Sequence, residues 1–194
     1  LAEDNRALLE VPAQPTVRVQ VYSDQPNLLR PVLSANPNVA AVFASPSAYN
    51  PKNEARIVVL DGFRPAALPD ADTIWIEPPA GASPFVVRAT VKGTQLERWH
   101  PENALGAGLR ARDLKLDSTE VFTAASGDLP IADCAAGPVI LARPGKRKSV
   151  AFGFHPGRTA MRFELATPLV FANILRWMAP EVFRRWEMNG GSVG

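Results

Sequence analysis

The sequence predicts an α/β fold, and three stretches carry this prediction. Residues 17–21 alternate valine with polar residues, as a strand with one buried face does, and residues 28–33 follow with helical spacing. Residues 56–60 form an apolar run that ends at Asp61, which is typical of a parallel strand covered on both faces. Residues 167–178 predict a buried helix. Together they predict a flavodoxin-like, mostly parallel sheet flanked by helices, with antiparallel strand additions in the second half.

The remaining elements are predicted between these stretches. A strand at 71–77 is stopped by Pro78 and Pro79, which have no N–H group to continue a sheet ladder. Residues 139–142 and 150–154 flank a basic turn and predict an antiparallel pair. Pro31 is expected in the first turn of its helix, where a missing N–H group does least harm. Further extended segments are expected at 39–43, 86–91, 95–99 and 114–122.

The length of 194 residues and a hydrophobic content of 46% fit one domain with a substantial core. We expect this domain over residues 16–188. Prolines mark residues 1–15 as a linker or the tail of a preceding domain. Residues 189–194 are rich in glycine and are predicted to form a flexible tail. Because the chain begins at Leu1, without methionine, we expect it to be a piece of a longer protein.

Charge and composition exclude several classes of function. The net charge of +2 is too small for a nucleic-acid footprint. The chain has no apolar run of about 18 residues, so we expect no direct membrane insertion by this chain. A single cysteine, two histidines and no HExxH or CxxC motif predict neither an internal disulfide nor a metal site, and no cofactor is expected. One basic cluster remains, which is either a solvated turn or a phosphate contact: Arg143, Lys146, Arg147 and Lys148.

Two motifs resemble the class I glutamine amidotransferases. One is Val58-Val59-Leu60-Asp61-Gly62, followed by Leu68-Pro69, and the other is Gly153-Phe154-His155-Pro156-Gly157. The resemblance implies a Cys-His-Glu triad whose cysteine stands on a tight turn between a strand and a helix, and it places His155 at the histidine of that triad.

The chain departs from the triad at the other two positions. Glu77, followed by two prolines, stands where the cysteine turn should follow the fourth strand, and Gly157 stands where the glutamate should be. A histidine without nucleophile or orienting carboxylate is a poor catalyst, so we expect no glutaminase and, on balance, no enzyme. Cys134 lies far from the expected turn and is interpreted as a structural thiol.

A second resemblance concerns the surroundings of the domain. Residues 165–177 are similar to the end of degenerate amidotransferase-like domains in bacterial membrane proteins that carry a von Willebrand factor A domain, of the Bat aerotolerance type. Residues 1–7 resemble the end of the β-sandwich that precedes such domains. This resemblance implies a non-catalytic interaction or structural module, a soluble domain of a membrane-anchored protein at the cell envelope. Its partners would be other domains or proteins of a bacterial envelope complex.

Two alternatives stay open. The chain could be a divergent hydrolase or small-molecule-binding domain that uses the carboxyl edge of the strands, with Asp61, Glu77, His155 and Arg158 as ligand-binding candidates. It could also be an unrelated flavodoxin-like domain. A binding or hydrolytic domain predicts an open polar pocket where these side chains converge, whereas an interaction module predicts a filled edge and an exposed apolar patch elsewhere. Ser23 either approaches such a ligand or caps the following helix.

Overall fold

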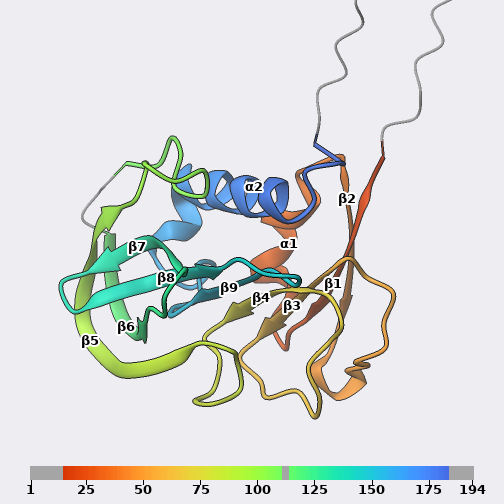
Figure 1. Ribbon diagram of the computed structural model, residues 1–194, viewed down its shortest axis with the longest axis horizontal. Helices are drawn as coiled ribbons and strands as arrows, with labels where there is room; N and C mark the ends of the chain where they lie inside the picture. The colour runs from red at the N-terminus through yellow and green to blue at the C-terminus, as the bar shows by residue number, and fades with distance from the viewer. Residues whose placement is uncertain (1–14, 111–113, 184–194) are drawn as a thin grey trace, which may run out of the picture.

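A computed structural model describes residues 15–110 and 114–183. Nine strands form one mixed sheet in the order β2-β1-β3-β4-β9-β8-β7-β5-β6, and two α-helices pack against it (Figure 1). The sheet has two halves with different strand directions, which meet at β9.

The first half is parallel, and its strands bring their carboxyl ends to one edge of the sheet. Every residue of the central strands β3 and β4 is buried, because the sheet is covered on both faces here. The parallel strands are β1 (Val17–Tyr22), β2 (Val39–Ala44), β3 (Ile57–Asp61), β4 (Asp72–Ile76) and β9 (Ser149–Phe152).

The second half is antiparallel and curls back toward the first. The long strand β5 bends strongly (Figure 1) and has register shifts that β-bulges or irregularities explain. The Glu120 N–H group donates to the Gly153 carbonyl oxygen at 2.7 Å, so β6 reaches the end of β9. The antiparallel strands are β5 (Val86–Trp99), β6 (Leu114–Thr123), β7 (Leu129–Cys134) and β8 (Gly137–Arg143).

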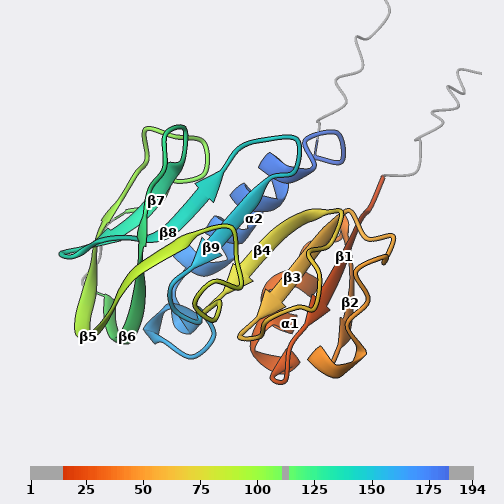
Figure 2. The ribbon, with the colours of Figure 1, turned by 60° about the horizontal axis from the view of Figure 1, so that its bottom comes forward.

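Both helices, α1 (Pro26–Ser34) and α2 (Ala166–Met178), lie on the same face of the sheet (Figures 1 and 2). Buried side chains of both helices, among them Leu29 and Phe171, pack in one apolar cluster with the sheet residues that face them. Two 3₁₀ turns, Pro46–Ala48 and Ala160–Phe163, complete the regular structure.

The other face of the sheet is covered by loops. A second apolar cluster forms there around Trp75, whose indole N–H donates to the Thr73 hydroxyl at 2.9 Å. The rings of Tyr22, Tyr49 and Phe63 meet edge to face at its margin, with centroids 5.0 to 6.3 Å apart. Aromatic side chains from loops thus bury the surface that helices would bury in a doubly wound fold.

The prediction of a flavodoxin-like, mostly parallel sheet flanked by helices is therefore wrong. Four neighbouring strand pairs are parallel and four are antiparallel, and no described helix covers the second face. An apolar run indicates that a strand is buried. It does not indicate the direction of the neighbouring strands, nor whether a helix or a loop covers the strand. The antiparallel pairing of 139–142 with 150–154 is confirmed, because β8 pairs with β9.

Three local predictions also need correction. The two strands expected at 86–91 and 95–99 are one continuous strand, β5, that passes through Gly93. Strand β7 was not predicted, because Pro130 and Asp133 interrupt its apolar pattern. Pro31 lies inside α1 rather than in its first turn. The tail predicted at 189–194 lies outside the described residues.

Candidate functional site

The candidate site lies at the carboxyl edge of the parallel half. Ser23 follows β1, Asp61 ends β3, Glu77 follows β4 and His155 comes shortly after β9. The chain leaves β1 toward β2 on one side, and β3 lies on the other, so the strand order reverses between β1 and β3. In open α/β sheets, ligands bind outside the strand ends at such a point. The structure brings the sequence-predicted residues to this edge.

Ser23, Asp61 and His155 form a chain of contacts with the carboxylate in the middle. The Ser23 hydroxyl donates to Asp61 Oδ2 at 2.5 Å, and His155 Nε2 lies 3.4 Å from the same oxygen. The Gly157 N–H group donates to His155 Nδ1 at 3.0 Å, which leaves the ring proton of a neutral histidine on Nε2. Ser23 also accepts a hydrogen bond from the Gln25 N–H group at 2.9 Å, at the start of α1. The serine proton thus points to the aspartate, so His155 has no hydroxyl to deprotonate.

This part of the site is closed to solvent. The His155 residue is 0% exposed and Asp61 is 6% exposed. His155 Nε2 and Asp61 Oδ1 are buried without a hydrogen-bond partner among the described residues. Buried polar atoms are normally paired, so this pair is the least satisfied part of the carboxyl edge.

Glu77 connects the end of β4 to the loop after β9. It is the non-glycine residue with positive φ (+44°) in the described chain, a conformation that costs energy and is kept only where the surroundings hold it. Its N–H group donates to the Phe152 oxygen at 2.9 Å, and Oε1 accepts from the His155 N–H group at 3.1 Å. Its Oε2 lies 2.6 Å from Arg158 Nη1, and Arg158 Nε donates to Gln25 Oε1 at 3.1 Å. The side chain therefore fixes the loop that carries His155.

Glu120 belongs to the same region, although no pattern in the sequence pointed to it. Burial, and secondly the charge of Glu77, raise the pKa of the Glu120 carboxyl to about 7. Its Oε2 is buried without a partner among the described residues. Its backbone meets Gly153 so closely that a Cβ on Gly153 would stand 2.0 Å from the Glu120 oxygen. Glu120 lies on an antiparallel strand, so only the curl of β6 brings it to this edge.

The structure shows which residues stand at the two triad positions where the sequence departs from the amidotransferases. Glu77 occupies the bend of the cysteine, and Pro78 and Pro79 supply no N–H groups for an oxyanion. A Cβ on Gly157 would stand 2.8 Å from the Leu28 oxygen and 2.9 Å from the Leu28 Cβ, so a glutamate cannot fit there without a shift. Glu77 and Gly157 thus stand at the positions that the resemblance assigns to the cysteine and the glutamate.

The other reactive side chains lie elsewhere. Cys134 is a free, buried thiol at the end of β7, and β8 lies between β7 and β9. His100 lies after β5 in the antiparallel half, with Nδ1 2.7 Å from Glu102 Oε1 and Nε2 2.7 Å from Asp133 Oδ2. Neither residue joins the carboxyl edge.

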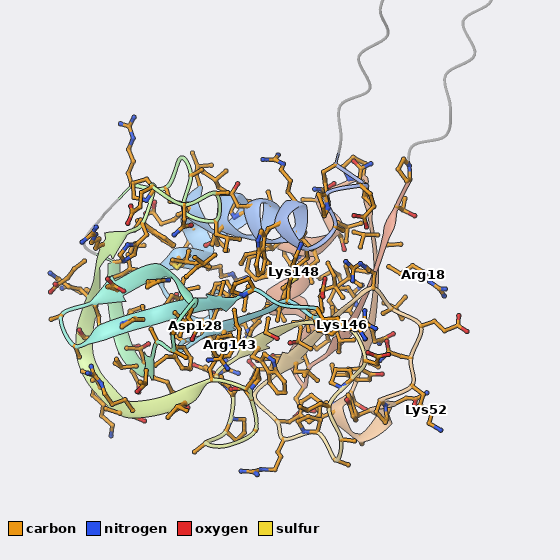
Figure 3. All side chains as sticks on the ribbon, in the orientation of Figure 1. Arg18, Lys52, Asp128, Arg143, Lys146 and Lys148 are labelled. Atoms are coloured by element: carbon orange, nitrogen blue, oxygen red, sulfur yellow. The ribbon has the colours of Figure 1, made fainter. Side chains whose placement is uncertain are left out.

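The basic side chains around the β8–β9 turn mostly bind neighbours within the chain (Figure 3). Arg143 forms two hydrogen bonds to the Asp128 carboxylate, at 2.7 and 2.8 Å, and lies over the Phe85 ring. The further contacts are those of Arg147 with Asp70 and of Lys148 with the Trp177 oxygen. These contacts favour a structural turn over a phosphate site.

Among residues 15–110 and 114–183, no group of three or more His, Cys, Asp or Glu side chains is arranged to hold a metal ion. Nor does any helix in these ranges have the length and apolar character needed to cross a membrane.

The sequence matches no protein-family profile and no curated protein. Solved structures do match the fold. A cytoplasmic protein from Salmonella typhimurium LT2 aligns with a TM-score of 0.65 and 9% identity, over 84% of this chain and 99% of its own. A ThuA-like protein from Bacteroides uniformis aligns with a TM-score of 0.61 and 8% identity, over 90% of this chain and 96% of its own.

A third match bears on the resemblance found in the sequence. A GMP synthase-like protein from Thermoplasma acidophilum aligns with a TM-score of 0.54 and 12% identity, over 86% of this chain and 96% of its own. The fold is similar to a glutamine amidotransferase-like fold. At this identity the match concerns the fold alone, and the triad positions described above differ.

Proposed function

We propose that this chain is a non-catalytic, glutamine amidotransferase-like module, an interaction or structural domain of a larger membrane-anchored bacterial protein. One observation carries the proposal: Glu77, at the position that the resemblance assigns to the nucleophile, is held in a strained conformation with a φ of +44°. Its carboxylate is engaged by the His155 N–H group and by Arg158. Both oxygens of the Glu77 carboxylate are thus engaged in holding the loop after β9.

The accessibility of the edge supports the same proposal. His155 is fully buried, and the Asp61 oxygen beside it is bonded to Ser23. A general base must reach the proton that it abstracts, directly or through one water molecule. The placement in a membrane-anchored protein with a von Willebrand factor A domain is supported by the resemblance of residues 165–177 and 1–7 alone.

An exposed apolar groove supports a role in interaction. It has a volume of about 360 Å³ and lies where the Ala160–Phe163 turn leads into α2. Phe163 and Leu165 are each 86% exposed, and Leu169 is 37% exposed. Contiguous exposed apolar side chains on a folded domain mark contact surfaces. Its lining residues are Gly108, Leu109, Arg110, Leu114, Phe163, Glu164, Leu165, Ala166 and Leu169.

The test asks whether Glu77 stabilises the fold or takes part in catalysis. Ammonia release from glutamine by the wild-type chain is expected to equal the protein-free blank. Glu77→Ala should lower the free energy of unfolding by about 1–2 kcal/mol, because it removes a charged hydrogen bond and an ion pair. Glu54→Ala, whose side chain is 86% exposed, is the matched control and should change stability by less than about 0.5 kcal/mol. Ammonia release that Glu77→Ala abolishes would contradict the proposal, as would a gain in stability.

A divergent binding domain remains the second candidate, and the unpaired Asp61, His155 and Glu120 atoms favour it. A small polar ligand at this edge should raise the free energy of unfolding by about 2.7 kcal/mol at 100 times its dissociation constant. Thermal shifts with glutamine, other amino acids and nucleotides measure this effect. A shift that Asp61→Asn abolishes would support the binding domain. If no ligand gives such a shift, only the first proposal remains.

A further inference from the structure

Strand β2 forms one edge of the sheet, and its hydrogen-bonding groups alternate in direction. The Val17 N–H group donates to the Asn38 oxygen at 2.8 Å, and the Ser23 N–H group donates to the Ala44 oxygen at 3.1 Å. In a parallel ladder, alternate residues bond to the same neighbour, so the even-numbered residues of β2 face β1. The N–H and C=O groups of Ala41 and Phe43 therefore point away from the sheet.

This edge lacks the devices that usually protect a sheet edge. Its sequence, Val-Ala-Ala-Val-Phe-Ala, has no charge and no proline, and its register with β1 is unbroken over six residues. The opposite edge strand, β6, carries Lys115, Asp117 and Glu120 and bonds back to the end of β9. Unprotected, uncharged edges are templates for another strand. Within the described chain, the two edges differ in this respect.

We infer that β2 pairs with β2 of a second copy of this chain, antiparallel, about a two-fold axis at Val42. A two-fold axis perpendicular to the sheet keeps each side chain on its own face, so residues of equal parity must stand opposite each other. An axis at Val42 sets Ala41 of each copy opposite Phe43 of the other. Each such pair exchanges two N–H···O=C bonds, so the outward N–H and C=O groups of Ala41 and Phe43 are all paired.

The side chains fit this arrangement. Val42 is 60% exposed and lies on the face away from the helices, beside Ala40 in a shallow groove. At the axis it meets its own symmetry mate, and each copy's Ala40 stands opposite the other's Ala44. On the helical face, Phe43 lies under the Arg30 guanidinium at 4.4 Å, and the small side chain of Ala41 stands opposite it. Because β2 has no charged residue, no two like charges meet across the axis.

The pairing is expected to be weak, because a six-residue edge buries less than the roughly 1,200 Å² of a standard interface. Strand β2 carries none of the side chains of the candidate site and none that line the apolar groove, so the pairing stands or fails independently of the proposed function.

The experiment is sedimentation velocity on the full chain from about 1 μM to about 500 μM. The average mass of the wild type should rise toward that of a dimer. Val42→Lys should remain monomeric, because two ammonium groups would meet at the axis while the bonds to β1 stay intact. Val86→Lys is the matched control, since Val86 is 63% exposed on β5, and it should dimerise like the wild type.

A mixture gives the decisive result. Val42→Glu alone should also be monomeric, but equal amounts of Val42→Glu and Val42→Lys should associate, because opposite charges then meet at the axis. Circular dichroism melts of each variant establish that the variants fold. A wild type that stays monomeric at every concentration overturns the inference, and so does a mixture that fails to associate.

Discussion

The two histidines lie in different halves of the sheet, each beside carboxylates, and they differ in how deeply they are buried and in how their ring nitrogens are paired. In the antiparallel half, both ring nitrogens of His100 lie 2.7 Å from carboxylate oxygens, and its side chain is 13% exposed. In the parallel half, His155 is fully buried, and its Nε2 lies 3.4 Å from Asp61 without a hydrogen bond. Both ring nitrogens of His100 have a carboxylate partner, although Asp133 Oδ1 is itself buried without a partner among the described residues, whereas His155 keeps an unpaired ring nitrogen in the interior.

The comparison teaches that proximity to carboxylates does not make a site. In the His100 cluster, water competes for Glu102, whose side chain is 57% exposed, so that contact contributes little. Buried clusters are costly unless every atom is paired, and they persist where the fold holds them. The network of Ser23, Asp61, Glu77 and His155 is thus expected to be sensitive to single changes, and the cluster around His100 to tolerate them.

The largest effect is expected at Gly153, where the two halves of the sheet meet. Gly153→Ala places a Cβ 2.0 Å from the Glu120 oxygen, between strands that hydrogen-bond to each other, so we expect a loss of about 4 kcal/mol or failure to fold. Gly106→Ala is the comparison, since its Cβ also meets a backbone oxygen, that of His100, at 2.0 Å. Gly106 lies in a turn and not between two paired strands, so we expect its substitution to cost less in urea unfolding. Equal costs would show that the junction is not rigid.

Next in size is the removal of one partner from each histidine cluster. Ser23→Ala removes the hydroxyl that donates to buried Asp61 and should lower the free energy of unfolding by about 3 kcal/mol, because a buried carboxylate is left unpaired. His100→Ala should cost about 1 kcal/mol, since the Glu102 side chain is 57% exposed and water replaces the ring. Both are measured by chemical denaturation at pH 7. A larger loss at His100 would reverse the comparison.

The parallel half was the more predictable one. Carboxyl ends of parallel strands share an edge, so Asp61, Glu77, His155 and Arg158 could be assigned to one place from their positions after predicted strands and from the motif alone. The sequence leaves open whether Ser23 caps the helix or belongs to the site. The N-cap of α1 is Gln25, without a side-chain cap, so Ser23 is not the cap: its hydroxyl accepts from the Gln25 N–H group and donates to Asp61.

The antiparallel half could not be predicted to the same degree. The position of Glu120 depends on how far β6 curls, which is set by tertiary contacts and leaves no local pattern. Strand β7 was missed because Pro130 and Asp133 break its alternation, although its pairing with β5 and β8 fixes it in the sheet. The covering of the second face by aromatic loops is equally invisible to periodicity, because it joins residues such as Tyr49 and Phe63 that lie in separate loops.

The smallest effect sharpens the comparison through pH. The pKa of Glu120 is raised in the folded chain from 4.5 to about 7, so its folded state binds the proton more tightly than the unfolded state does. The stability that protonation contributes is present below pH 4.5 and is lost as pH rises toward 7. Glu120→Gln removes this loss and should be more stable than the wild type by about 1–2 kcal/mol at pH 8, a shift discounted for a carboxyl that is only partly buried. At pH 4 the two proteins should differ little.

Glu102 gives the opposite sign and serves as the control. Its own backbone N–H group and then the His100 ring lower the pKa of this carboxyl, so its stabilisation is present above pH 4.5 and is lost as pH falls through the lowered folded value. Urea unfolding from pH 3 to pH 8 should therefore show that Glu120→Gln flattens the decline in stability on the alkaline side. Glu102→Gln should flatten the decline in stability on the acid side and leave the slope on the alkaline side unchanged. If Glu120→Gln leaves the alkaline decline unchanged, the carboxyl of Glu120 is not the group that titrates there, and its burial against Glu77 does not destabilise the carboxyl edge.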